Sequence, residues 1–137
     1  MSSSQIKQGP GNLVPYTEKQ QFLLAGTVTK GDVVTFSGAT GYTIEIGAIA
    51  LPVVGVAAES GVAGDWIDVI VHGFCDYLTC TTTDVPDKAY LFQAAIGDCI
   101  GTASAATGAA YVGPAFGVSL QAQTGTTITA AWIFKNI

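Results

Sequence analysis

Short apolar runs separated by turn residues are the feature that most limits what this chain can fold into. From Phe22 onward, β-branched and aromatic residues form runs of a few residues, and Gly, Asp and Pro interrupt them about every ten residues. This spacing is typical of all-β proteins, and no segment of useful length repeats its apolar residues with a helical period. The sequence therefore predicts a small β-barrel or sandwich. The expected strands are Phe22–Thr29, Asp32–Ser37, Tyr42–Ile46, Val53–Ala58, Trp66–Gly73, Cys75–Cys80, Ala89–Ala94, Ala115–Leu120 and Thr126–Phe134.

The segment Trp66–His72 indicates how one of these strands divides its side chains. Successive residues of a strand point to opposite faces, so alternate residues share a face. The face that we expect to be core consists of Ile67, Val69 and Val71. The other face is mixed and consists of Trp66, Asp68, Ile70 and His72. A mixed face suits a surface that solvent or a partner covers in part.

Two parts of the sequence resemble each other. Pro52-Val53-Val54-Gly55-Val56 recurs as Pro114-Ala115-Phe116-Gly117-Val118, and each copy is followed by a glycine and then an apolar strand. Lys30-Gly31-Asp32-Val33-Val34 has a weaker counterpart in Asp87-Lys88-Ala89-Tyr90-Leu91. We therefore expect two β units of roughly fifty residues around one shared core. The alternative is a chance likeness within a chain rich in Gly, Ala and Val.

The N-terminal segment differs in composition from the rest. Residues Met1–Tyr16 are mostly Ser, Gln, Gly, Pro and Asn, which cannot bury enough apolar surface to fold alone. We expect a flexible arm over residues 1–21 that becomes ordered against another surface. One β domain follows over residues 22–137, a length suited to a single core.

Charge and hydropathy exclude several classes of partner. The net charge is −5, and all five basic residues are lysines, so no basic stripe is available for nucleic acid or anionic lipid. The longest apolar stretch, Ile46–Ala58, is interrupted by Gly and Pro and is too short to span a bilayer. No secretory signal is visible, so we expect a chain that acts where it is made or leaves by lysis. In that setting Cys75, Cys80 and Cys99 are expected to be reduced thiols.

A long segment near the C-terminus, Cys99–Phe134, is uncharged. This segment contains no Asp, Glu, Lys or Arg. An uncharged exterior promotes association between protein chains. We therefore expect an oligomer interface in this region. Its predicted residues are Phe116, Ile128, Trp132 and Phe134. The alternative is that Thr, Ser, Gln and Gly solvate the segment without a partner.

No catalytic, cofactor or metal site is predicted. His72 is the single histidine, with Asp68 on the same face, but no nucleophile motif accompanies it. The Cys75-to-Cys80 spacing is wider than that of a usual zinc knuckle, and no phosphate-binding glycine loop is present. An enzyme that depends on His72 and a carbohydrate-binding module remain as alternatives. The aromatic platform of such a module would come from Trp66, Trp132, Tyr42, Tyr77, Tyr90 and Tyr111.

The order of several glycine motifs resembles that of a known family. The motifs are Gly31-Asp32-Val33-Val34, Val54-Gly55-Val56-Ala57, Gly64-Asp65-Trp66-Ile67-Asp68-Val69, Gly73 and Gly117-Val118. They are similar to those of the capsid decoration proteins of tailed phages, also called cement or head-stabilising proteins. The resemblance implies an all-β virion protein, often a trimer, that is made in the host cytoplasm and binds the major capsid protein at the capsid surface. The capsid-binding arm would comprise Ser2, Ser3, Ser4, Gln5, Ile6, Lys7, Gln8, Pro10, Asn12 and Leu13.

Overall fold

The computed structural model describes residues 16–37, 43–47, 52–80, 85–95, 98–102, 112–123 and 125–135. These residues form β-strands and turns, which confirms the predicted all-β class. None of the described residues belongs to a helix with the length and apolar character that a membrane crossing requires. The strands are β1 (Thr17–Leu24), β2 (Val33–Phe36), β3 (Thr43–Ile46), β4 (Val53–Ala57), β5 (Trp66–Cys75), β6 (Leu78–Thr79), β7 (Tyr90–Ala95), β8 (Asp98–Thr102), β9 (Val112–Ser119), β10 (Thr127–Ile128) and β11 (Ala131–Ile133).

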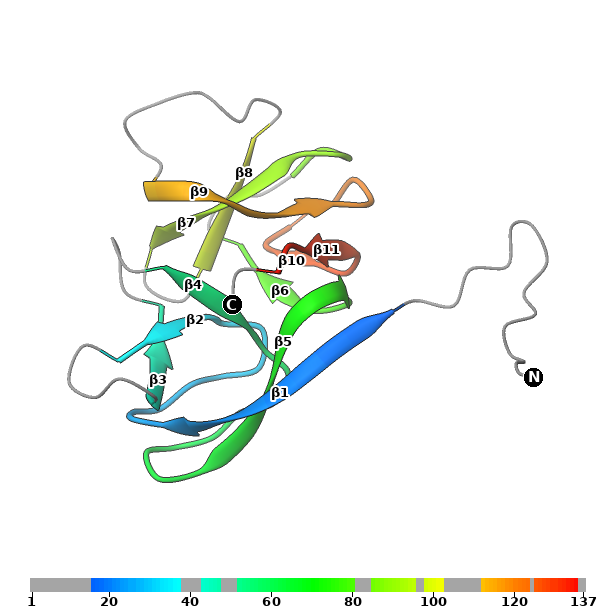
Figure 1. Ribbon diagram of the computed structural model, residues 1–137. Helices are drawn as coiled ribbons and strands as arrows, with labels where there is room; N and C mark the ends of the chain where they lie inside the picture. Colours follow the sequence, from blue (N-terminus) through cyan, green and yellow to red (C-terminus); the bar gives the residue numbers. More distant parts are fainter. Residues whose placement is uncertain are drawn as a thin grey trace, which may run out of the picture.

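The first five strands close into a barrel. They pair in the order β1-β3-β2-β4-β5, and β5 then pairs antiparallel with β1 to complete the circle. The closing pairs run from Thr17↔Gly73 to Leu23↔Trp66, while β1 meets β3 in parallel. Figure 1 shows this barrel in the lower half of the view, with the long β1 crossing β5. Because closure leaves no unpaired strand edge inside the ring, a barrel of this size is protected from edge-to-edge aggregation.

The remaining strands extend from the last residues of β5. β11 pairs with Gly73–Cys75, and the sheet continues in the order β11-β9-β7-β8. β6 and β10 form a separate two-stranded sheet. In Figure 1 these strands make up the upper half of the molecule. β5 therefore serves both halves, with its first part in the barrel and its end in the extension.

The strand order confirms the internal duplication. β3-β2-β4-β5 in the first unit has the same order as β8-β7-β9-β11 in the second. The registers also agree, because Val56 faces Ile70 between β4 and β5, and Val118 faces Trp132 between β9 and β11. The two copies of the Pro-x-x-Gly-Val motif thus occupy matching places in two similar β units.

The weaker of the two sequence likenesses is confirmed as well. The amide of Gly31 donates to the carbonyl of Ala57 at 2.9 Å, and the amide of Lys88 donates to the carbonyl of Ser119 at 3.0 Å. Gly31 and Lys88 both have positive φ, 92° and 62°. Among the described residues other than glycine, Lys88 alone has a positive φ, a conformation that L-residues adopt at an energetic cost. A shared turn geometry that persists without glycine supports a common origin of the two units.

Each unit has its own core, whereas the sequence predicted one shared core. The barrel interior holds Leu24, Val28, Val34, Ile44, Val54, Ala57, Ile67, Val69 and Val71. The second cluster holds Cys75, Leu78, Cys80, Val85, Ala89, Leu91, Phe116, Ile128, Ala131 and Ile133. Val33, Val56 and Ile70, from the outer wall of the barrel, join this second cluster. The face of β5 assigned to the core is thus confirmed, and Ile70 on its other face is also buried because the second unit covers it.

The N-terminal boundary of the β domain lies earlier than predicted. β1 begins at Thr17 rather than Phe22, so residues 17–21 belong to the barrel and not to an arm. This segment is polar, and Lys19, Gln20 and Gln21 are exposed. Its pairing with β5 relies on backbone hydrogen bonds, which a search for apolar alternation does not detect. The predicted arm residues Ser2 to Leu13 lie outside the described part of the chain.

Other strands also differ from expectation, and β8 was not expected at all. β8 contains an aspartate and a glycine among its five residues, which is not the usual composition of a strand. It is nevertheless paired with β7 from Tyr90↔Thr102 to Ala95↔Asp98. The predicted strand Thr126–Phe134 is divided into β10 and β11 by a bend at Thr129 and Ala130. This bend lets the segment pair with β6 first and with β5 and β9 afterwards.

Candidate functional site

A partly exposed row of mainly aromatic residues crosses the sheet of the second unit. Trp132 on β11 lies opposite Val118 on β9, and Val118 lies opposite Tyr90 on β7, so the three side chains share one face. Tyr16 and His72 adjoin Trp132 at the end of this row. We call these five residues the aromatic face. Tyr16 is 51% exposed and Tyr90 38% exposed, which makes the face accessible to a partner.

Ring contacts hold one end of the aromatic face in place. The His72 ring lies nearly perpendicular to the rings of Tyr16 and Trp132, with ring centroids 5.6 Å and 5.7 Å apart. The centroids of Tyr16 and Trp132 are 6.5 Å apart. The two perpendicular contacts of His72 are of the edge-to-face kind that is favourable for aromatic rings. A large, amphipathic surface is therefore presented in a fixed orientation.

Charged groups border this end of the face. Glu18 lies 3.9 Å from Nδ1 of His72 and 3.4 Å from Nζ of Lys135. The Tyr16 hydroxyl donates to Glu18 Oε1 at 3.3 Å. The sequence indicated Asp68 as the carboxylate that shares a face with His72. In the structure, the carboxylate beside the imidazole is that of Glu18 on β1. An aromatic centre with a polar rim is the usual composition of a protein-protein interface.

Of the four residues predicted to form an oligomer interface, the structure leaves two at the surface. Phe116 is 1% exposed and Ile128 0% exposed, so both side chains belong to the second core and offer no surface to another subunit. Trp132 and Phe134 are half-buried and reach the surface. Interface contacts through these two residues remain a prediction. Phe116 is buried because it occupies the place that Val54 occupies in the barrel core.

The four described aromatic residues of the proposed sugar platform do not gather in one place. Trp66 is 60% exposed at the start of β5, whereas Trp132 and Tyr90 belong to the aromatic face. Tyr77 lies beside Lys30, with the ammonium 5.3 Å from the ring centroid. Tyr42 and Tyr111 lie outside the described residues. Tyr16 joins the face although the sequence placed it in the arm.

Two of the cysteines are buried free thiols, as predicted. Burial raises the pKa of the Cys75 thiol to about 11, and the nearby Asp76 carboxylate acts in the same direction. The thiol donates to the carbonyl of Tyr77 at 3.3 Å. Cys75 is therefore protonated at neutral pH and a poor nucleophile, since the thiolate is the reactive form. The Cys99 side chain lies outside the described part.

Together these features define a small all-β protein built from two similar units, with a partly exposed aromatic surface. Among solved structures, the chain is similar to the head fiber gp8.5 N base of bacteriophage phi29, with 16% sequence identity and a TM-score of 0.56. The likeness covers 89% of this chain and 98% of the phage chain. At this identity it establishes a common fold. No family model matches the sequence. No curated protein matches it either.

Proposed function

We propose that this protein is a structural virion protein that binds the outer surface of an assembled phage capsid as a trimer and stabilises the shell. The observation that carries the proposal is the fold shared with the base of a phage head fibre over nearly the whole of both chains. The motif resemblance to capsid decoration proteins, read from the sequence alone, points in the same direction. The proposed partners are the major capsid protein and other copies of this chain.

In this proposal the aromatic face supports self-association. Trp132 is a half-buried, fixed ring at the centre of an exposed surface, the setting in which tryptophan contributes most to binding. Glu18 and Lys135 lie at the rim, where charges direct orientation more than they add affinity. A trimer joined through this face would bring three N-terminal segments to one place, because Tyr16, the first described residue, belongs to the face.

Attachment to the shell is assigned to the N-terminal segment Ser2–Leu13. An arm of this kind gains backbone hydrogen bonds by pairing with an exposed strand edge of a capsid subunit. Each arm loses conformational entropy when it becomes ordered, but three linked arms bind with far higher overall affinity than one. A ligand that binds the assembled lattice and not its separated subunits stabilises the lattice by mass action.

Self-association is tested by replacing Trp132 with alanine. Truncating a central interface tryptophan costs about 2 kcal/mol or more, which corresponds to at least about a thirtyfold weaker association per contact. Sedimentation velocity over a range of protein concentrations measures this change. In the same samples, co-sedimentation with intact shells, and with shells dissociated into subunits, should show binding to the intact shells only.

The matched control is Trp66→Ala. Trp66 is the more exposed tryptophan, yet it lies outside the aromatic face, so its loss should leave association and shell binding unchanged. Thermal melting of both variants separates lost binding from lost folding. If Trp132→Ala folds and associates like the parent protein, the aromatic face is not the interface. Equal binding to intact and dissociated shells would contradict the decoration role.

A further inference from the structure

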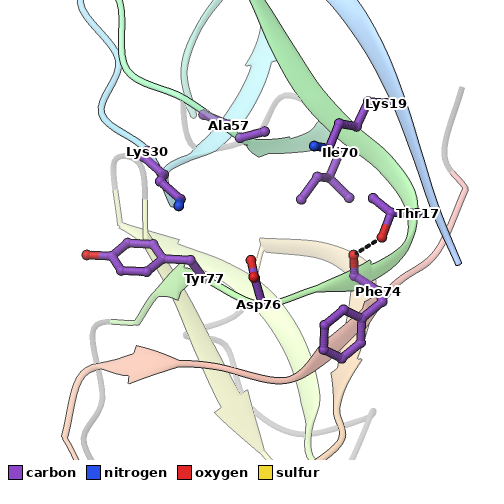
Figure 2. Close-up of a pocket in the computed structure, with 9 residues that line it drawn as sticks. Thr17, Lys19, Lys30, Ala57, Ile70, Phe74, Asp76 and Tyr77 are labelled. Atoms are coloured by element: carbon purple, nitrogen blue, oxygen red, sulfur yellow. Dashed lines mark hydrogen bonds between the residues drawn. The ribbon is translucent and has the colours of Figure 1, made fainter. Parts of the chain in front are cut away.

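A cavity of about 260 Å³ lies where the barrel meets the second unit. Its walls come from β1, the turn before β2, β4, β5 and the link between β5 and β6. Figure 2 shows Lys30 and Tyr77 on one side of the cavity, Thr17 and Phe74 on the other, and Asp76 between them. Junctions between structural units are preferred places for small-ligand sites. The volume suits a ligand smaller than a typical drug molecule.

The cavity has a buried apolar floor and a charged mouth. Ala57 and Ile70 form the floor and are almost completely buried. Lys19, Lys30 and Asp76 line the mouth, and none of them forms an ion pair with another described residue. Two of the five lysines of an acidic chain thus line one small cavity. Two ammonium groups against one carboxylate favour an anionic ligand at this place.

Local structure fixes the position of Lys30. The Thr29–Asp32 turn is closed by a hydrogen bond from the Asp32 amide to the Thr29 carbonyl at 3.0 Å, and the Asp32 carboxylate accepts from the Thr29 amide at 2.9 Å. The Lys30 amide donates to Ser60 Oγ at 2.9 Å. The ammonium then rests 5.3 Å from the centroid of the Tyr77 ring, a cation–π contact. Lys30 is therefore partly preorganised, which reduces the entropy that binding would cost.

The opposite wall is fixed by another hydrogen bond. The Thr17 hydroxyl donates to the carbonyl of Phe74 at 2.8 Å, which ties the start of β1 to the end of β5. The hydroxyl oxygen keeps its capacity to accept a hydrogen bond from a ligand. Asp76, whose carboxylate points into the space in Figure 2, can likewise only accept when ionised. A ligand that fits must therefore carry donors as well as a negative charge.

We propose that this cavity binds a single acidic sugar, with the carboxylate against Lys19 and Lys30 and ring hydroxyls donating to Asp76 and Thr17. The apolar side of the sugar ring would rest on Ile70 and Ala57. A sugar acid combines a carboxylate with several hydroxyl donors on one small ring, as the two lysines and Asp76 require. The site would be distinct from the aromatic face and independent of capsid binding.

The duplication predicts one such site per chain. The residue that corresponds to Lys30 in the second unit is Asp87, which reverses the charge. The residue that corresponds to Ile70 is Trp132, which belongs to the aromatic face. At these two described positions, the second unit therefore does not repeat the chemistry of the cavity.

The proposal is tested by nuclear magnetic resonance titration of the full-length protein with sodium glucuronate, following the backbone amides of Lys30, Asp76 and Tyr77. We expect saturable shifts with one site per chain. Charge-assisted hydrogen bonds account for much of the affinity, so glucose should bind at least about tenfold more weakly. Lys30→Gln and Lys19→Gln should each weaken glucuronate binding by about five- to tenfold.

Lys88→Gln is the matched control. Lys88 is an exposed lysine paired with Asp87 outside the cavity, so its replacement should leave glucuronate binding unchanged. Absence of saturable shifts at these amides would overturn the site. Equal binding of glucose would overturn the role of the two lysines. If N-acetylglutamate bound as tightly as glucuronate, the cavity would recognise a carboxylate without selecting a sugar, and the assignment to an acidic sugar would be wrong.

Discussion

Replacing Gly55 with alanine is expected to lower the free energy of unfolding by about 3 kcal/mol. A methyl group at this position would overlap the carbonyl oxygen of Ile70 on the neighbouring strand and lie 3.0 Å from Val69 Cγ1. Within a strand, alanine is ordinarily favoured over glycine by about 0.5–1 kcal/mol, so the expected change has the opposite sign. Gly117→Ala should act in the same direction, because its methyl group would lie 2.6 Å from the carbonyl oxygen of Trp132.

Chemical denaturation of a graded set of glycine variants measures this effect. Gly26→Ala is the control, since nothing lies within 4 Å of the added methyl group, and its stability should change by no more than about 0.5 kcal/mol. Gly64 also has open space, but its φ of +93° should make the alanine variant less stable by about 1 kcal/mol. If the Gly55→Ala variant proved as stable as the Gly26→Ala variant, β4 and β5 would not approach each other as closely at Gly55 as the structure indicates.

Deleting Ser2–Asn12 is expected to leave the β domain folded and to weaken shell attachment by about a hundredfold or more. The described strands begin at Thr17, so the truncated chain keeps every strand pairing that the structure describes. Its melting temperature should therefore match that of the full chain. Attachment would fall steeply because the proposed arms act together, and losing all of them removes the avidity of the trimer as well as each single contact.

In a second variant the arm is replaced by a Gly/Ser segment of equal length. This variant shows whether shell attachment depends on the sequence of the arm or only on its length. Co-sedimentation with intact shells at several protein concentrations measures attachment of the full, truncated and replaced chains. We expect the replaced chain to bind as weakly as the truncated one. Full-strength attachment of the truncated chain would exclude the arm mechanism.

The duplication could be predicted because its key glycines have a steric role. Gly55 and Gly117 permit a close approach of neighbouring strands, so the motif around them persists while other residues change. The same match would have corrected the interface prediction. Phe116 is the counterpart of Val54, which lies in the barrel core. The absence of charged residues from the surrounding sequence does not show toward which face of the sheet a side chain points.

Other features depend on contacts between distant segments and could not be read from local pattern. The polar strand β1 is held by backbone pairing with β5, and β8 forms although its glycine and aspartate disfavour a strand. The aromatic face requires Tyr16, Trp132 and Tyr90 to meet through the registers of separate strands. The cavity likewise combines Thr17, Lys30 and Asp76 from three segments, and no sequence motif connects them.

The most direct measurement of the central claim is density-gradient separation of particles from cells that produce this protein, followed by mass spectrometry of each fraction. The decoration role predicts that the chain bands with intact particles in a fixed ratio to an abundant shell protein. It also predicts that the ratio stays constant when the particles are banded a second time. Recovery of the chain at the top of the gradient, with none in the particle band, would contradict a structural role in the virion.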